Sequence, residues 1–109
     1  MRVKPLLVSA SLLIAVGIAE SVLAQPFTMR IVDEFGDGVA NVRVVTDNGI
    51  VCYSLLDGTL RWAESSLMSR SVRFSIHDDT HTFAGTVATI AVKRGAGVVV
   101  PLDRIQPAS

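Results

Sequence analysis

The segment Val39–Trp62 constrains the fold more than any other part of this 109-residue chain; it reads VANVRVVTDNGIVCYSLLDGTLRW. Three short apolar runs are separated by two turn signals, Asp47-Asn48-Gly49 and Asp57-Gly58. Asn and Gly tolerate the positive φ angles that tight hairpins require, and both signals are typical of hairpins between β-branched runs. The segment therefore predicts a β-meander with strands near residues 40–46, 50–55 and 59–62.

Alternating or apolar runs before and after this meander predict further strands. Phe27, Met29 and Ile31 recur at every second position, which predicts a first strand over 27–33 with one buried face. Val72, Phe74 and Ile76 do the same in 71–77. Another strand is expected to begin at His81–Phe83. Two more are expected over Val87–Val92 and Val98–Asp103.

For two of these strands, the sequence indicates a position within a sheet. Val87–Val92 is apolar on both faces, so a central position is expected for it. Pro101 lacks an amide donor, so the last strand is expected to lie at an edge or to end early. The only stretch with helical character is Ala63–Arg70, which is too short to form a stable helix without packing. Many short strands without a long helix favour an all-β sandwich.

The first 24 residues have the three parts of a secretory signal peptide. Arg2 and Lys4 form a basic start, Leu6–Ile18 is apolar, and Val22-Leu23-Ala24 supplies a cleavage site before Gln25. The apolar run is short for a membrane span. We therefore expect a leader over 1–24, a β-sandwich domain over 25–104 and a polar tail over 105–109, in a secreted protein of the periplasm or extracellular space with no membrane span after cleavage.

The expected mature chain has nearly balanced charge, with eight basic and nine acidic residues after position 24. Such a balance gives no electrostatic footprint for nucleic acid. The one cysteine, Cys52, cannot form an intramolecular disulfide. It lies on the same face of its expected strand as Ile50 and Ser54, which favours a small buried hydrophobe, and the alternatives are a reactive thiol or an intermolecular disulfide.

Several of these residues resemble one known family. Val32-Asp33, Gly36, Val39 and the run Asn41-Val42-Arg43-Val44 resemble the start of carboxypeptidase regulatory-like domains, a transthyretin-like branch of the immunoglobulin-like sandwiches. A proline is usual in that family where Gly38 stands here. A second match runs through Trp62, Glu64, Leu67-Met68, Val72–Ile76 and Val98–Arg104.

The resemblance implies a single seven-stranded antiparallel sandwich that serves as an accessory or adhesion-type module. It implies no catalytic residues and no cofactor. The hydrolase relatives of transthyretin end in Tyr-Arg-Gly-Ser, and this chain does not, so their activity is not carried over.

The sequence offers one cluster of metal-ligating residues, His77-Asp78-Asp79-Thr80-His81. In an extended strand, His77, Asp79 and His81 would share a face. Two imidazoles and a carboxylate suit Zn²⁺ or Cu²⁺. The other reading is an ordinary solvated turn, since Asp-rich segments commonly form turns.

Two aromatic residues are candidates for a binding surface. Trp62 ends an expected strand, where core packing is the alternative, and Phe35 lies in the acidic, glycine-rich segment 33–38. The expected function is a non-catalytic module that binds an unknown protein or glycan partner or acts as a scaffold. The alternative function is a small periplasmic metal-binding protein that uses His77 and His81.

Overall fold

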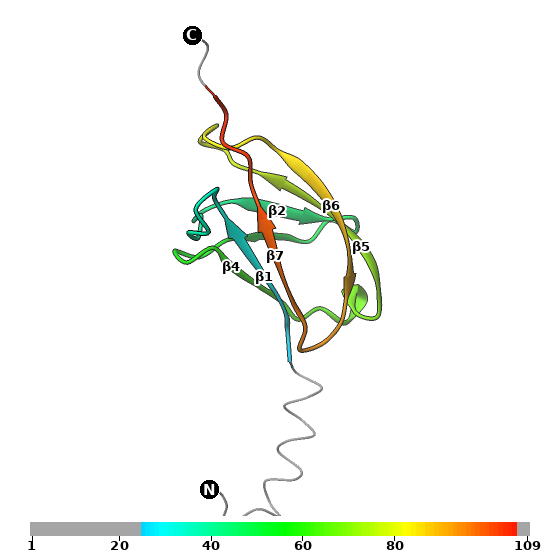
Figure 1. Cartoon of the computed structure of the whole chain (residues 1–109). Helices are drawn as coiled ribbons and strands as arrows, with labels where there is room; N and C mark the ends of the chain where they lie inside the picture. The colour runs from blue at the N-terminus through cyan, green and yellow to red at the C-terminus, as the bar shows by residue number, and fades with distance from the viewer. Residues whose placement is uncertain (1–24, 107–109) are drawn as a thin grey trace, which may run out of the picture.

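Only the first hairpin of the predicted meander forms, because the third strand of that segment lies in the other sheet. The computed structural model describes residues 25–106, which fold into an all-β sandwich of a three-stranded and a four-stranded sheet (Figure 1). The strand orders are β4-β1-β7 and β3-β2-β5-β6. The elements are β1 (Phe27–Val32), β2 (Arg43–Thr46), β3 (Val51–Tyr53), β4 (Thr59–Trp62), the short 3-10 helix η1 (Ser65–Leu67), β5 (Arg70–His77), β6 (Thr86–Val92) and β7 (Gly97–Pro101). The expected leader and residues 107–109 lie outside the described residues.

The first turn signal behaves as the sequence predicts. β2 and β3 pair antiparallel, and Gly49 has a φ of 88° in the turn between them. After the second signal, the chain crosses to the other sheet, where β4 pairs with β1. Gly58 has a φ of 84° at this crossing, so its turn connects two layers rather than two neighbouring strands.

The expectation of a purely antiparallel sandwich is wrong for one pair of strands. β7 runs parallel to β1, from Thr28 opposite Gly97 to Val32 opposite Pro101. The chain crosses to β7 from β6, which lies in the opposite sheet. It then runs beside β1 and in the same direction as β1. β7 is an edge strand, as Pro101 indicated.

Two further strand expectations need correction. β6 lies at an edge of the four-stranded sheet rather than in its centre, and Val87 on it is half exposed. Apolar residues on both faces of a strand do not determine its neighbours. Residues 81–83 form no strand; they belong to a loop in which Phe83 makes an isolated bridge with Arg104.

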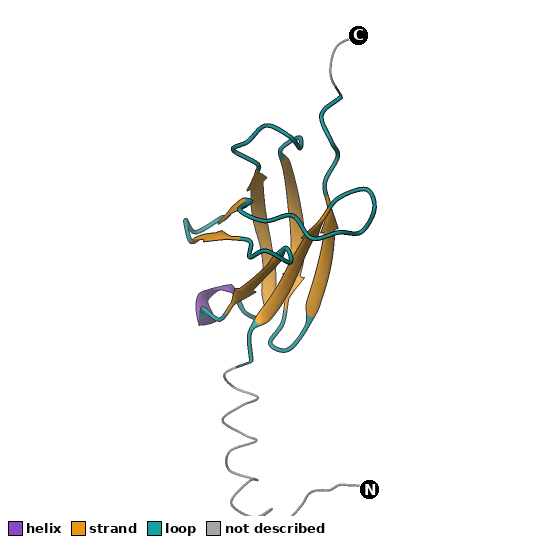
Figure 2. Ribbon diagram, turned by 90° about the vertical axis from the view of Figure 1, so that its left-hand side faces the viewer, coloured by secondary structure: helices purple, strands orange, loops and turns teal. Residues whose placement is uncertain are grey.

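The core lies between the two sheets, whose strands pack face to face in Figure 2. The expected inward residues of β1 and β5 are all buried there. The ring of Trp62 from β4 lies 5.4 Å from that of Phe74 on β5, and Leu67 of η1 covers one end of the core. The core residues are Phe27, Met29, Ile31, Val42, Val44, Leu60, Trp62, Leu67, Val72, Phe74, Ile76, Phe83, Val92, Val100 and Leu102.

Trp62 provides a test of this core. Its indole Nε1 is buried and has no hydrogen-bond partner among the described residues. Trp62→Ala should lower the free energy of unfolding by about 3–5 kcal/mol, most of the stability of so small a domain. Trp62→Phe should cost less than half as much, because it also removes the unsatisfied donor. Denaturant unfolding measures both, and equal losses would contradict the description of this core.

Candidate functional site

Two loops lie side by side at one end of the sandwich, at the left of Figure 1. The first, residues 33–38, follows β1; the second, residues 55–58, connects β3 to β4. We call these two segments the loop pair. Each carries an apolar side chain at its tip.

Two glycines allow the loops to touch. A side chain at Gly38 would overlap with the carbonyl group of Asp57, and one at Gly58 would overlap with the carbonyl oxygen of Ile31. The Gly58 carbonyl also accepts a hydrogen bond of 2.8 Å from the Ile31 amide. This close approach gives a physical reason for the glycine at position 38.

One arginine connects the backbones of both loops. Arg30 projects from β1, and its Nε donates to the Asp57 carbonyl oxygen at 3.1 Å. Its Nη1 donates to the Gly36 carbonyl oxygen at 3.3 Å. Because both acceptors are backbone atoms, Arg30 fixes the path of the chain in each loop.

Each loop is also held by its own hydrogen bonds. Asp33 Oδ1 accepts hydrogen bonds of 2.9 Å from the amides of Phe35 and Asp37. In the second loop, the Gly58 amide donates to the Leu55 carbonyl oxygen, and Asp57 Oδ1 accepts the Thr59 amide. The hydrogen bonds to the Asp57 carboxylate lower its pKa. Side chains that cap their own turns in this way stiffen a loop.

A third contact braces the first loop against the C-terminal segment. Arg104 and Glu34 form a two-pronged ion pair with both N–O distances at 2.9 Å, which lowers the pKa of Glu34. The Arg104 guanidinium also lies 4.7 Å from the centre of the Phe83 ring. The first loop is thereby attached to β1, to the second loop and to residue 104.

The tips of the loop pair are apolar and exposed. Phe35 is 79% exposed and Leu56 is 91% exposed, while the adjacent Leu55 is 57% exposed. The sequence indicated Phe35 but not the two leucines. Two leucines directly before an Asp-Gly turn were the available signal, because turn tips face solvent.

The second aromatic candidate, Trp62, does not contribute to a surface. Only 1% of its surface is exposed, because β4 turns this side chain toward Phe74 and the rest of the core. The expectation that Trp62 offers a binding surface is therefore corrected, and its core reading holds.

The histidine segment does not assemble three ligands. His77 is exposed at the end of β5, Asp79 forms an ion pair with Arg43 at 3.2 Å, and His81 adopts a left-handed backbone with a φ of 59°. Across residues 25–106, no group of three or more His, Cys, Asp or Glu side chains is placed to hold a metal ion. The extended strand that would align the three residues is replaced by a loop.

Asp78 explains that loop. Its carboxylate accepts the amides of Thr80, Thr82 and Phe83 at 2.9–3.0 Å. Burial acts to raise the pKa of Asp78, but the hydrogen bond from the Thr80 hydroxyl, together with those from the amides, outweighs it, and the pKa is lowered. A carboxylate that accepts hydrogen bonds from three amides of the residues after it bends the chain, so residues 78–83 cannot stay extended.

Cys52 lies where the sequence placed it, on the inner face of β3 opposite Val44. Its thiol is free, partly buried and packed against the core. Burial raises the pKa of the Cys52 thiol, so the reactive thiolate is disfavoured.

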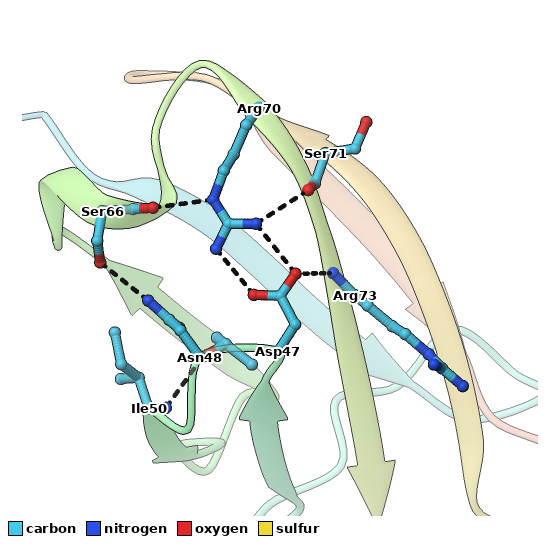
Figure 3. Close-up of polar contacts among 8 residues, drawn as sticks. Asp47, Asn48, Ile50, Ser66, Arg70, Ser71 and Arg73 are labelled. Atoms are coloured by element: carbon cyan, nitrogen blue, oxygen red, sulfur yellow. Dashed lines mark hydrogen bonds and ion pairs between the residues drawn. The ribbon is translucent and has the colours of Figure 1, made fainter.

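A cluster of polar side chains lies around the β2–β3 turn, just after the end of β2 (Figure 3). Arg70 donates two hydrogen bonds to the Asp47 carboxylate, at 2.8 and 3.0 Å, and its Nε donates to the Ser66 carbonyl oxygen. The Arg73 amide also donates to Asp47, and Asn48 donates to the Ser66 hydroxyl. The cluster connects the β2–β3 turn, η1 and β5, which is a bracing role.

A shallow groove of about 460 Å³ lies beside this cluster. It contains hydroxyl groups and basic side chains but no carboxylate or imidazole in its lining. The lining residues are Ser69, Arg70, Ser71, Ala91, Val92 and Lys93. Because Arg70 is already paired with Asp47, we consider the loop pair the stronger candidate for a functional site.

Asp47 makes the brace sensitive to acid. The hydrogen bonds from Arg70, followed by that from the Arg73 amide, lower its pKa from 3.8 to about 2. A lowered pKa contributes stability above the unfolded value, and this stability is lost as the pH falls from about 4 toward about 2. The difference in thermal midpoint between the protein and Asp47→Asn should therefore be constant above pH 5 and close toward pH 2. Asp103→Asn, which removes a carboxylate without an ion pair in residues 25–106, is the control. A difference in thermal midpoint between the protein and Asp47→Asn that persists at pH 2 would contradict the bracing role of the Asp47 carboxylate.

Comparisons with known proteins add no identification. A scan against models of known protein families finds no match, and a search of curated proteins finds no significant relative. Within residues 25–106, no helix is long and apolar enough to span a membrane.

Proposed function

We propose that this chain is a secreted, non-catalytic β-sandwich module that binds a protein partner through the loop pair. The observation that carries the proposal is the display of Phe35 and Leu56 at the tips of two loops held together by Arg30. Binding or scaffolding in the periplasm or extracellular space is the role that the expected leader supports.

The rigidity of the loops favours a binding role for their tips. An exposed apolar side chain gains free energy when a partner removes it from water, at about 25 cal/mol per Å². Ordering a flexible loop on binding would offset part of that gain. The loops here are already held by several hydrogen bonds to their backbones, so less ordering remains to be done.

The charges of the loop pair indicate the kind of partner. Its two segments contain four acidic residues and no basic residue: Asp33, Glu34, Asp37 and Asp57. Only Glu34 has an ion-pair partner in the described part of the chain. An anionic lipid surface would be repelled, whereas a protein with an apolar pocket and a basic rim would be complementary. The two exposed leucines favour a protein over a glycan, which stacks on flat aromatic faces.

We also propose that the chain belongs to the transthyretin-like carboxypeptidase regulatory-like domains. The support is the resemblance through residues 32–44 and 62–104, together with a sandwich of three and four strands. Accessory or adhesion modules of that kind suit the proposed binding role.

Site-specific crosslinking tests the proposal. A photoreactive amino acid at Leu55 should form one defined adduct in the organism that encodes the chain, because this exposed position is next to Leu56 in the second loop. Phe35→Ser/Leu56→Ser should reduce the adduct at least about tenfold, as expected for buried hot-spot residues. The same double substitution should change the free energy of unfolding by no more than about 0.5 kcal/mol, because both side chains are exposed.

Two further variants make the result specific. Val51→Ser removes a side chain of 51% exposure on β3, beside the β2–β3 turn and away from the loop pair, and it should leave the adduct unchanged. Asp37→Lys should weaken the adduct if the partner has a basic rim. An adduct that survives Phe35→Ser/Leu56→Ser, or one equally sensitive to the control, would contradict the proposal.

A further inference from the structure

β6 is an edge strand that lacks the usual protection against pairing. Its seven residues, Thr86–Val92, include no charged residue, proline or glycine. A long, uncharged edge strand is a template for another strand. The antiparallel ladder with β5 occupies one side of β6 and leaves the other side open.

The other three edges are protected by features of their sequences. β3 has only three residues, and β4 has four, including the exposed Arg61. β7 begins with Gly97 and ends with Pro101. Short length, charge and proline each discourage edge-to-edge pairing. The contrast singles out β6.

Two hydrogen bonds show which backbone groups of β6 face outward. The Arg73 amide donates to Asp47 on the β2 side, so the neighbouring residues of β5 direct their amides toward β6. The Val92 carbonyl accepts a bond from the Ser69 amide, so it faces β5. Alternation then directs the N–H and C=O groups of Val87, Thr89 and Ala91 toward the open side.

These three outward residues are arranged symmetrically about Thr89. In an antiparallel pair of two β6 strands centred there, Thr89 faces its own copy and Val87 faces Ala91. Between them, Ala88 faces Ile90. Each larger side chain thus meets a smaller one, and a Thr–Thr pair lies on the symmetry axis, which is a favourable cross-strand pair.

The charges at the two ends of β6 are also complementary. Lys93 and Arg94 follow the strand and make no ion pair within the described residues. In this register, Arg94 of one copy faces Ala84 of the other. The Ala84 amide donates to the carbonyl oxygen of Asp103, whose carboxylate likewise has no ion-pair partner in residues 25–106. The basic end of each copy would approach an acidic residue of the other.

We propose that β6 pairs antiparallel with β6 of a second copy of this chain about Thr89, joining the two four-stranded sheets into one. The loop pair takes no part in this contact, so the inference stands or falls separately from the proposed function. The paired edge is small, so the dissociation constant should be about micromolar or weaker.

Sedimentation equilibrium of residues 25–109 across protein concentrations tests the pairing. The chain should change from monomer to dimer with increasing concentration. Thr89→Lys should raise the dissociation constant at least about tenfold, because it places like charges opposite each other on the axis. Val51→Lys adds the same charge on β3, at the opposite edge of the same sheet, and should leave the dimer intact. Thermal unfolding checks that both variants fold.

Disulfide trapping tests the register in a Cys52→Ala background. Thr89→Cys should form an intermolecular disulfide, since facing Cα atoms in such a pair lie about 5.5 Å apart. Val87→Cys alone should not, but Val87→Cys together with Ala91→Cys should. A monomer at all concentrations would overturn the proposal and would leave this edge to a strand of another protein. A dimer insensitive to Thr89→Lys, or trapping in another register, would also overturn it.

Discussion

The close contact of two loop backbones at Gly38 and Gly58 is the constraint on which the proposed binding site depends. Any larger residue at either position would collide with the facing backbone, so the loops could not lie side by side. Arg30 then bonds to a carbonyl group in each loop. Backbone contacts and the Arg30 side chain thus fix the positions of Phe35 and Leu56. The exposure of these two side chains takes little from the stability of the fold, because the core lies elsewhere.

The sequence predicted the features that depend on local chemistry. Period-two alternation identified the buried faces of β1 and β5, and the glycines at 49 and 58 marked turns that need positive φ. The sequence could not predict long-range strand pairing, because the parallel β1–β7 pair and the edge position of β6 depend on contacts between distant strands. For the histidine segment, the sequence left an extended strand and a solvated turn open. The turn forms, because the Asp78 carboxylate accepts the amides of Thr80 and Phe83 and bends the chain. Of the candidate site, Phe35 could be predicted; its pairing with the second loop could not.

The two surfaces differ in how they would bind. The loop pair offers apolar side chains with an acidic surround, which suits a pocket on another protein. The edge of β6 offers backbone groups and no charge, which suits a strand. The ion pair between Asp47 and Arg70 holds β5 against the β2–β3 turn. It therefore supports the four-stranded sheet, of which β6 is an edge. A module with both surfaces could bind a partner while paired with its own copy.

Backbone ¹⁵N relaxation measures whether the loop pair is a rigid unit. We expect order parameters of about 0.85 for the amides of Phe35 and Leu56, equal to those of the strands, and lower values in Gly38→Ala. Order parameters below about 0.6 at these amides in the unaltered protein would show two flexible loops, and the loop pair would then not be rigid.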